Sequence, residues 1–196
     1  MIICGKVKNK KRKIISQIMV SIDGFIEGPD GEINWHNVDE EYNEYASGLL
    51  NSADAILFGR RTYQLMADYW QTPNAFLNDP VIARLMNQLP KIVFSKTLEK
   101  IEWQNSRLVK ENIVEEITQL KRQQGHDLVI LGSADLTSRF TKLGMVDEYQ
   151  IMVNPVVLGK GKPFFNNIQK LNLELLYSKS FRSGNVLICY QPRQSD

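Results

Sequence analysis

Short apolar runs alternate with amphipathic segments over most of the chain. Residues 55–58, 91–94 and 128–131 form runs of strand length, and the last of them reads Leu-Val-Ile-Leu. Runs that are apolar at nearly every position are typical of strands covered by helices on both faces. The segments between them carry apolar residues at helical spacing, which predicts helices over about 38–51, 62–69, 79–87, 113–124 and 135–143.

The pattern changes from Val146 onward, where β-rich segments follow one another without a strong helix. These segments cover 149–158, 173–181 and 186–190. Gly184 and Asn185 lie between the last two and suit the positive φ of a hairpin turn. With a further β-rich run at 14–22, the pattern predicts a three-layer α/β fold whose mainly parallel central sheet ends in a C-terminal antiparallel hairpin.

Basic residues are concentrated at the start of the chain. Six of the 24 lysines and arginines precede Ile14, whereas all 22 acidic residues follow it, which leaves 18 basic residues and a net charge of −4 in the remainder. No repeat or linker divides that remainder, so we predict one domain over 14–196 after a flexible basic extension over 1–13. The basic residues of the extension are Lys6, Lys8, Lys10, Lys11, Arg12 and Lys13.

Charge and hydropathy exclude several classes of partner. A weakly acidic body argues against a nucleic-acid-binding face, and an RNA contact through the basic extension is the alternative. No apolar run approaches the roughly 20 residues of a membrane-spanning helix, and the first residues do not resemble a signal peptide. We therefore expect a cytoplasmic protein that contacts neither nucleic acid nor membrane.

Cysteines and histidines are too few for a disulfide framework or a metal site. Cys4 and Cys189 are the only cysteines, and His36 and His126 are the only histidines. We expect Cys189 to be a buried small hydrophobe and no metal to be bound. The sequence also lacks GxSxG, P-loop and zinc-deaminase motifs, which argues against hydrolase, phosphotransferase and deaminase chemistry.

The strongest local signal is the junction after the run 128–131, where Gly132, Ser133 and Ala134 lead directly into a predicted helix. Small residues at a helix start let a phosphate or pyrophosphate approach unpaired backbone N–H groups. The alternative is a tight turn in which Ser133 or Asp135 caps the helix.

Two further clusters follow predicted strands. Gly59, Arg60, Arg61 and Thr62 come after the run 55–58, and Ser95, Lys96 and Thr97 come after the run 91–94. Arginine suits bidentate phosphate binding, and the absence of an acid in these clusters favours NADP over NAD. Because carboxyl ends of parallel strands share one edge of a sheet, the three clusters together predict a dinucleotide site.

The first loop supplies candidate substrate residues. It holds Asp23, Trp35, His36 and Asp39. Trp35 is a candidate to cover a flat heterocycle, Asp23 to orient it, and Asp39 to act as the catalytic acid. The alternatives are that Asp23 belongs to an Asp-Gly turn, that Trp35 is core, and that Asp39 is the N-cap of the helix that follows.

The ordered set of motifs resembles the dihydrofolate-reductase-like superfamily, most closely the reductase (C-terminal) domain of the bifunctional riboflavin-biosynthesis deaminase-reductase in a stand-alone form. The resemblance covers nearly all of the body. It rests on residues 19–26, Trp35, 58–63, 131–134, Phe140, Leu143, 146–148, 154–159 and 163–165.

This resemblance implies a homodimeric reductase that binds NADPH. It places Gly132, Ser133, Ala134 and Leu136 near the pyrophosphate. It places Arg60 to Thr62 together with Ser95 and Lys96 near the phosphates and ribose, and Trp35 against the nicotinamide.

The chain departs from the family pattern at the substrate. The riboflavin enzyme has a Glu two residues before the glycine that corresponds to Gly132, where it helps to hold the pyrimidine, and this chain has Ile130. Unpaired polar groups on the substrate would cost roughly 1–3 kcal/mol each. We expect a stand-alone form without the deaminase domain, and the acid that binds folate in dihydrofolate reductases matches either Asp39 or Glu40.

The leading hypothesis is therefore an NADPH-dependent reductase of a small heterocyclic substrate, pyrimidine-like or pterin-like, or of a carbonyl compound. The alternative is a non-catalytic nucleotide-binding protein of the same fold.

Overall fold

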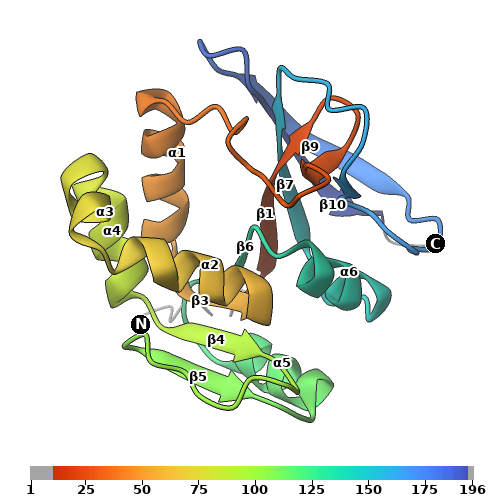
Figure 1. Cartoon of the computed structure of the whole chain (residues 1–196). Coiled ribbons are helices and arrows are strands. Elements are labelled where there is room, and N and C mark those ends of the chain that lie inside the picture. The colour runs from red at the N-terminus through yellow and green to blue at the C-terminus, as the bar shows by residue number, and fades with distance from the viewer. Residues whose placement is uncertain (1–10, 194–196) are drawn as a thin grey trace, which may run out of the picture.

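The computed structural model describes residues 11–193, which form one large sheet with helices on both faces (Figure 1). The strands are β1 (Ile14–Ser21), β2 (Phe25–Glu27), β3 (Ala53–Gly59), β4 (Lys91–Phe94), β5 (Ser106–Val109), β6 (Asp127–Leu131), β7 (Glu148–Asn154), β8 (Lys162–Pro163), β9 (Leu173–Ser180) and β10 (Val186–Pro192). The helices are α1 (Glu40–Asn51), α2 (Arg60–Trp70), α3 (Pro73–Asn78), α4 (Pro80–Gln88), α5 (Ile113–Arg122) and α6 (Ala134–Lys142).

The large sheet has eight strands in the order β5-β4-β3-β6-β1-β7-β10-β9. Adjacent strands from β5 to β7 pair in parallel, and β10 is antiparallel to both β7 and β9. The hairpin between β9 and β10 is closed by a hydrogen bond of 2.9 Å from the Phe181 N–H to the Asn185 carbonyl oxygen, with Gly184 at φ +87°. The predicted mainly parallel sheet with a C-terminal antiparallel hairpin is confirmed.

Four short elements were not predicted from the sequence. Strand β5 has two polar residues among four and lies at the edge of the sheet, and β2 and β8 form a separate two-stranded sheet. Helix α3 begins at Pro73, with the Thr72 hydroxyl accepting from the Ala75 N–H. The three strands lack a long apolar run, and the six residues of α3 are too few to show a repeated helical pattern. The predicted strand 149–158 was too long, because β7 ends at Asn154 and proline, which lacks an N–H, follows it.

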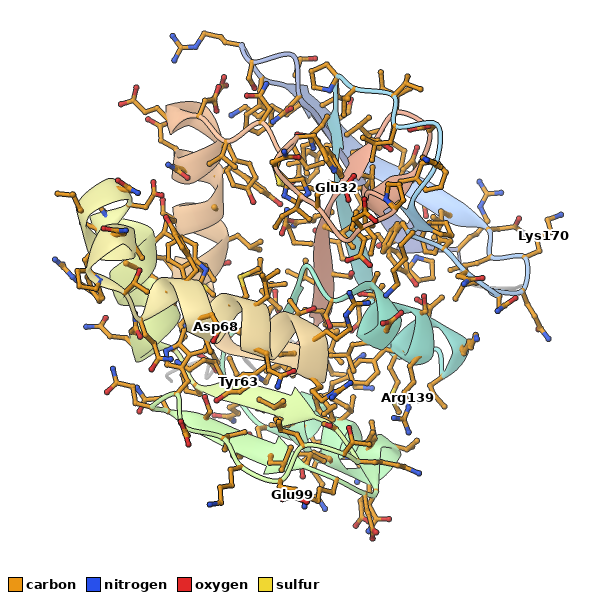
Figure 2. The ribbon with its side chains drawn as sticks, viewed as in Figure 1. Glu32, Tyr63, Asp68, Glu99, Arg139 and Lys170 are labelled. Atoms are coloured by element: carbon orange, nitrogen blue, oxygen red, sulfur yellow. The ribbon has the colours of Figure 1, made fainter. Side chains whose placement is uncertain are left out.

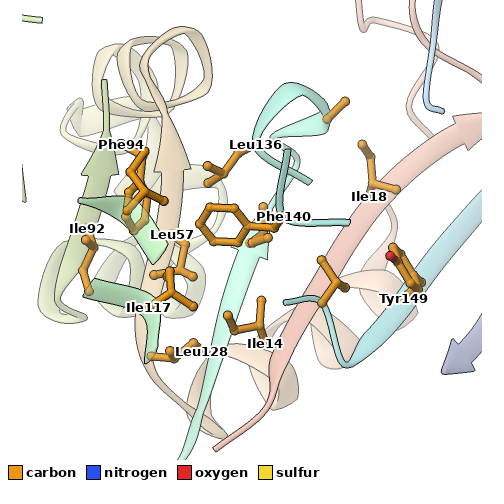
Figure 3. Packing of buried hydrophobic residues seen from close by; sticks show 14 of the residues in the cluster. Ile14, Ile18, Leu57, Ile92, Phe94, Ile117, Leu128, Leu136, Phe140 and Tyr149 are labelled. Atoms are coloured by element: carbon orange, nitrogen blue, oxygen red, sulfur yellow. The ribbon is translucent and has the colours of Figure 1, made fainter. Parts of the chain in front are cut away.

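The hydrophobic core is divided by the sheet into two sides. On β1, Ile14 and Ile18 pack with residues of α5 and α6, whereas Ile15 and Met19 pack with residues of α1. Figure 3 shows the first side, with Phe140 of α6 at its centre; its ring meets that of Phe94 edge-on at 5.3 Å between centroids. This alternation explains why the parallel strands read as apolar throughout.

The predicted boundary between extension and domain was wrong for its last residues. Arg12 is 5% exposed, and its guanidinium donates to the His126 carbonyl oxygen at 2.7 Å and to Asp54 at 2.9 Å. Lys13 forms an ion pair of 3.1 Å with Glu148. These two residues belong to the folded domain because their charges have fixed partners there. Lys11 is exposed, and residues 1–10 of the predicted extension lie outside the described residues.

Cys189 is fully buried, as predicted, and burial raises the pKa of its thiol. Within residues 11–193, no helix is long and apolar enough to cross a bilayer.

Candidate functional site

The helices that follow two adjacent parallel strands lie on opposite faces of the sheet. Strands β3 and β6 are neighbours; α2 follows β3 and packs in one core cluster, and α6 follows β6 and packs in the other (Figure 1). In open α/β sheets this arrangement is a topological switch point, and ligands bind beyond the carboxyl ends of the strands there. The candidate site is therefore the edge where the β3–α2 and β6–α6 turns meet.

The Ser133 side chain joins these two turns. Its Oγ accepts from the Gly59 N–H at 3.0 Å and from the Thr62 hydroxyl at 3.3 Å, and the residue is only 3% exposed. Ser133 occupies the N-cap position of α6 but makes no side-chain capping bond, because its oxygen is engaged with the other turn. A Cβ at Gly59 would lie 2.9 Å from that oxygen, so the absence of a side chain permits the contact.

Gly132 has a backbone conformation that favours glycine. Its φ is +66°, and its N–H donates to the Gln17 carbonyl oxygen at 2.9 Å. A Cβ there would be 3.8 Å from the nearest side-chain atoms, those of Met66 and Thr62, so conformation and not crowding restricts this position. The turn thus places the start of α6 at the edge of the sheet without a side chain in front of it.

The other predicted residues of this junction point into the core. Ala134 and Leu136 are both buried, and Leu136 packs beside Phe140. Their side chains are therefore placed for packing, and only their backbone groups are available to a phosphate. Asp135, in the first turn of α6, has its carboxylate in an ion pair of 2.7 Å with Lys162.

Cationic side chains follow the strands next to the junction. Arg60 and Lys96 are exposed, and the exposed Arg61 pairs at 3.5 Å with Glu27. Ser95 follows β4, the other neighbour of β3, and its hydroxyl accepts from the N–H groups of the two residues after Lys96. The three clusters predicted from the sequence therefore follow three adjacent strands, β4, β3 and β6.

The loop between β2 and α1 is held over the neighbouring strands. The Trp35 indole N–H donates to the Glu32 carbonyl oxygen at 3.2 Å, and the Trp35 ring meets His36 edge-on at 4.4 Å. The Asn37 N–H donates at 2.8 Å to the side chain of Asn154, the last residue of β7. Figure 2 shows Glu32 on this loop and Arg139 on α6.

The loop histidine is half-buried and neutral at pH 7. Burial lowers the pKa of His36 to about 4, although a hydrogen bond to the Ile26 backbone opposes the shift. Its Nε2 is buried without a hydrogen-bond partner among the described residues.

The Asp23 carboxylate anchors a second loop. It accepts from the Ser21 hydroxyl at 2.6 Å, the Leu158 N–H at 3.1 Å and the Gly159 N–H at 2.7 Å. These bonds, led by that from Ser21, lower the pKa of Asp23. Gly24 completes the turn with φ +83°, so the structure favours the Asp-Gly turn over a substrate contact.

Asp39 is the N-cap of α1. Its carboxylate accepts from the Tyr42 N–H at 2.8 Å, and its backbone is extended at φ −123°. The capping alternative is therefore present in the structure, and the carboxylate has a structural partner. Glu40, the other candidate acid, is exposed in the first turn of the same helix.

Ile130 lies away from the candidate site. It is fully buried on the side of the sheet covered by α5 and α6. Its neighbour Leu131 faces the other side, where it packs against the cluster that contains Leu49. The apolar residue at 130 is thus a core residue, and Leu131 is the β6 side chain that borders the α1 side.

Sequence reasoning missed one polar residue on that side, Gln17 of β1. The only signal in the sequence is a pair of polar residues, Ser16 and Gln17, inside an apolar run. Ser16 is accounted for by a bond of 2.7 Å between its hydroxyl and that of Thr137 on α6. Gln17 points to the opposite face, toward α1.

A separate open cavity of about 1180 Å³ lies at the other end of the sheet. It is bordered by the residues before β1, the end of α5, the α6–β7 loop and the end of β10. None of the predicted site residues lines it. Across residues 11–193, no group of three or more His, Cys, Asp or Glu side chains is placed to hold a metal ion.

Residues 12–188 match the RibD C-terminal domain family. The chain belongs to this family. It is 37% identical over 182 residues to the uncharacterized protein YyaP of Bacillus subtilis (strain 168), an alignment that covers 92% of this chain and 95% of that protein.

Solved structures share the fold of this RibD C-terminal domain protein. A structure from Shewanella sp. PV-4, provisionally named a riboflavin biosynthesis protein, has a TM-score of 0.73 at 22% identity and covers 93% of this chain and 99% of that one. Dihydrofolate reductase from Enterococcus faecalis, complexed with NADP(H), has a TM-score of 0.62 at 15% identity over 93% of this chain and 97% of that one. The reductase-like resemblance drawn from the sequence is confirmed at the level of family and fold.

Proposed function

We propose that this protein is an NADPH-dependent reductase of a small heterocyclic or carbonyl substrate. The observation that carries the proposal is the joining of the β3–α2 and β6–α6 turns through Ser133 at a topological switch point. Membership of a reductase-domain family supports it.

The residues at this edge fit a phosphorylated dinucleotide. The start of α6 offers backbone N–H groups and a partial positive charge to a pyrophosphate, and Gly132 leaves the approach open. Arg60, Arg61 and Lys96 would meet the 2′-phosphate, and Trp35 would cover the nicotinamide. When bound, NADPH supplies the hydride, while the chain orients it and the acceptor.

A second function is favoured by one specific observation. Both candidate acids have structural partners, Asp39 as a helix cap and Asp23 in a loop anchor. A nucleotide-binding protein without turnover needs no proton donor, so this arrangement suits it as well. The two functions differ in whether the bound cofactor is oxidised.

The test begins with binding and proceeds to turnover. NADPH and NADH are titrated while nicotinamide fluorescence is measured, and we expect at least tenfold tighter binding of NADPH, about 1.4 kcal/mol. A dihydropterin, a ribosylaminopyrimidine and simple carbonyls are then screened for NADPH oxidation. Binding without oxidation of any acceptor would favour the second function, and absence of NADPH binding would reject both.

We further propose that two copies associate through β9. This strand ends the sheet, and Leu175, Leu176 and Tyr177 are 54%, 39% and 47% exposed on it. An unpaired edge with exposed apolar side chains favours association with another strand. Leu175→Lys should turn a dimer into a monomer in sedimentation equilibrium, whereas Leu77→Lys, at an 80% exposed leucine on α3, should leave the dimer intact. A wild-type monomer would refute the proposal.

A further inference from the structure

A lysine from a distant loop reaches the first turn of α6. Lys162 of β8 forms an ion pair of 2.7 Å with Asp135, although the two residues are 27 positions apart in the sequence. The Lys162 side chain is 27% exposed and the Asp135 side chain is 72% exposed. An ion pair this open to solvent adds little to the stability of a fold, so stability alone does not account for a cation at this place.

The two-stranded sheet of β2 and β8 carries this lysine to the candidate site. Glu27 and Lys162 are register partners in that sheet. Glu27 pairs with Arg61 in the first turn of α2, and Lys162 pairs with Asp135 in the first turn of α6. The small sheet therefore connects the starts of the same two helices whose preceding turns are joined by Ser133.

The backbone around Lys162 is fixed by contacts within the chain. The Asp23 carboxylate accepts from two backbone N–H groups of the loop that leads into β8. Gly161 has φ +152°, and a Cβ there would lie 2.2 Å from the Glu27 carbonyl oxygen, so the close approach of β8 to β2 requires glycine. A cation held in this way loses little conformational freedom when it binds an anion.

The net charge at the start of α6 depends on this lysine. Asp135 places a negative charge in the first turn, which repels a phosphate at the junction of Gly132, Ser133 and Ala134. The Lys162 ammonium offsets that charge. Within residues 11–193 it donates one hydrogen bond, to Asp135, and an ammonium has three N–H donors. The remaining donors are free for the oxygens of a phosphate.

We propose that Lys162 binds the diphosphate bridge of the dinucleotide, with Asp135 holding the lysine ammonium beside the start of α6. This inference rests on the proposed reductase function and adds a cofactor-binding residue to it. The 2′-phosphate is assigned there to Arg60, Arg61 and Lys96, so the diphosphate and the 2′-phosphate use separate cations.

The alternative is that the ion pair only fixes the β7–β8 loop to α6. The two explanations differ in the effect of Asp135→Asn, which breaks the ion pair, keeps the ammonium and removes a repulsive charge. If the pair only fixes the loop, Asp135→Asn and Lys162→Gln should weaken cofactor binding alike. If Lys162 binds the diphosphate, Lys162→Gln should weaken binding, whereas Asp135→Asn should leave it equal or tighter.

Binding is measured on the full chain with three probes. NADPH is titrated by nicotinamide fluorescence, and inorganic pyrophosphate and adenosine 2′-phosphate are tested by the shift they cause in thermal unfolding. Lys162→Arg keeps the charge and shows whether a loss comes from the cation or from a disturbed loop. Lys170→Gln makes the same change as Lys162→Gln at an exposed lysine between β8 and β9 and is the matched control (Figure 2).

We expect Lys162→Gln to weaken NADPH binding at least about tenfold and to remove most of the shift caused by pyrophosphate, because a charge-assisted hydrogen bond is lost. The shift caused by adenosine 2′-phosphate should remain, because that compound lacks the diphosphate. Lys162→Arg and Lys170→Gln should bind NADPH within a factor of about three of the wild type, since both keep a cation beside α6.

Equal losses in Lys162→Gln and Asp135→Asn, or NADPH binding by Lys162→Gln within a factor of about two of the wild type, would overturn this proposal. Failure of the wild type to bind NADPH is a separate result that rejects the reductase proposal. Pyrophosphate then decides on Lys162 by itself: a shift in the wild type that is lost in Lys162→Gln supports a diphosphate-binding lysine, and an equal shift or none in both rejects it.

Discussion

Acidification should destabilise the protein through His36, the half-buried histidine of the loop that carries Trp35. Burial lowers the pKa of His36 to about 4 in the folded chain, whereas an unfolded histidine titrates near 6.5. Below pH 6.5 the unfolded chain therefore takes up a proton that the folded chain does not, and the free energy of unfolding falls as the pH falls toward 4. Below pH 4 both states are protonated and this contribution stays constant.

The magnitude follows from the two pKa values. Each unit of difference corresponds to about 1.4 kcal/mol, so the full effect is about 3 kcal/mol, and about 2.5 kcal/mol is lost between pH 7.5 and pH 4.5. Against a total stability of roughly 5–15 kcal/mol this is a large share. Because Asn37, next in the loop, ties it to β7, protonation of His36 should also loosen the cover over the candidate site.

Urea unfolding followed by tryptophan fluorescence at pH 7.5 and pH 4.5 measures this loss. Other groups contribute to acid sensitivity, since the pKa values of Asp23 and Glu41 are lowered by their hydrogen bonds. The wild type is therefore compared with His36→Gln, which should lose about 2.5 kcal/mol less than the wild type over this range. His126→Gln removes an exposed histidine and is the matched control. An identical pH dependence of the wild type and His36→Gln would refute the reasoning.

Three further predictions concern the candidate site. Replacing Arg60, Arg61 and Lys96 by Ala should remove most of the roughly tenfold preference for NADPH in a fluorescence titration and leave NADH affinity nearly unchanged; a preserved preference would exclude these side chains from the 2′-phosphate. Gly132→Val should abolish dinucleotide binding while the chain still folds by circular dichroism, because a β-branched residue at φ +66° would reshape the turn; normal NADPH affinity would make the junction a mere turn. Asp39→Asn should leave the free energy of unfolding nearly unchanged and turnover within a factor of about two of the wild type, because asparagine caps a helix as well as aspartate. A loss of ~10²–10⁴ in turnover would instead show that Asp39 is the catalytic acid.

The sequence by itself determined the framework of the fold. Runs such as 128–131 are too apolar for an exposed surface, so they had to become strands covered on both faces, and that pattern is local. Parallel strands place their carboxyl ends together, which is why the clusters at Gly59, Ser95 and Gly132 were predicted to share an edge before any contact between them was known.

Only the tertiary structure decided what individual polar side chains do there. Asp23, Asp39 and Ser133 carry the same groups whether they bind a ligand or the backbone, and their partners come from distant segments or from helix geometry that composition does not encode. Arg12 read as part of a solvated tail because its partner Asp54 is 42 residues away. The reverse holds for Gln17, which looked like an ordinary strand residue. Its burial beneath α1 appears only in the tertiary structure, since burial, unlike periodicity, is a property of the whole fold.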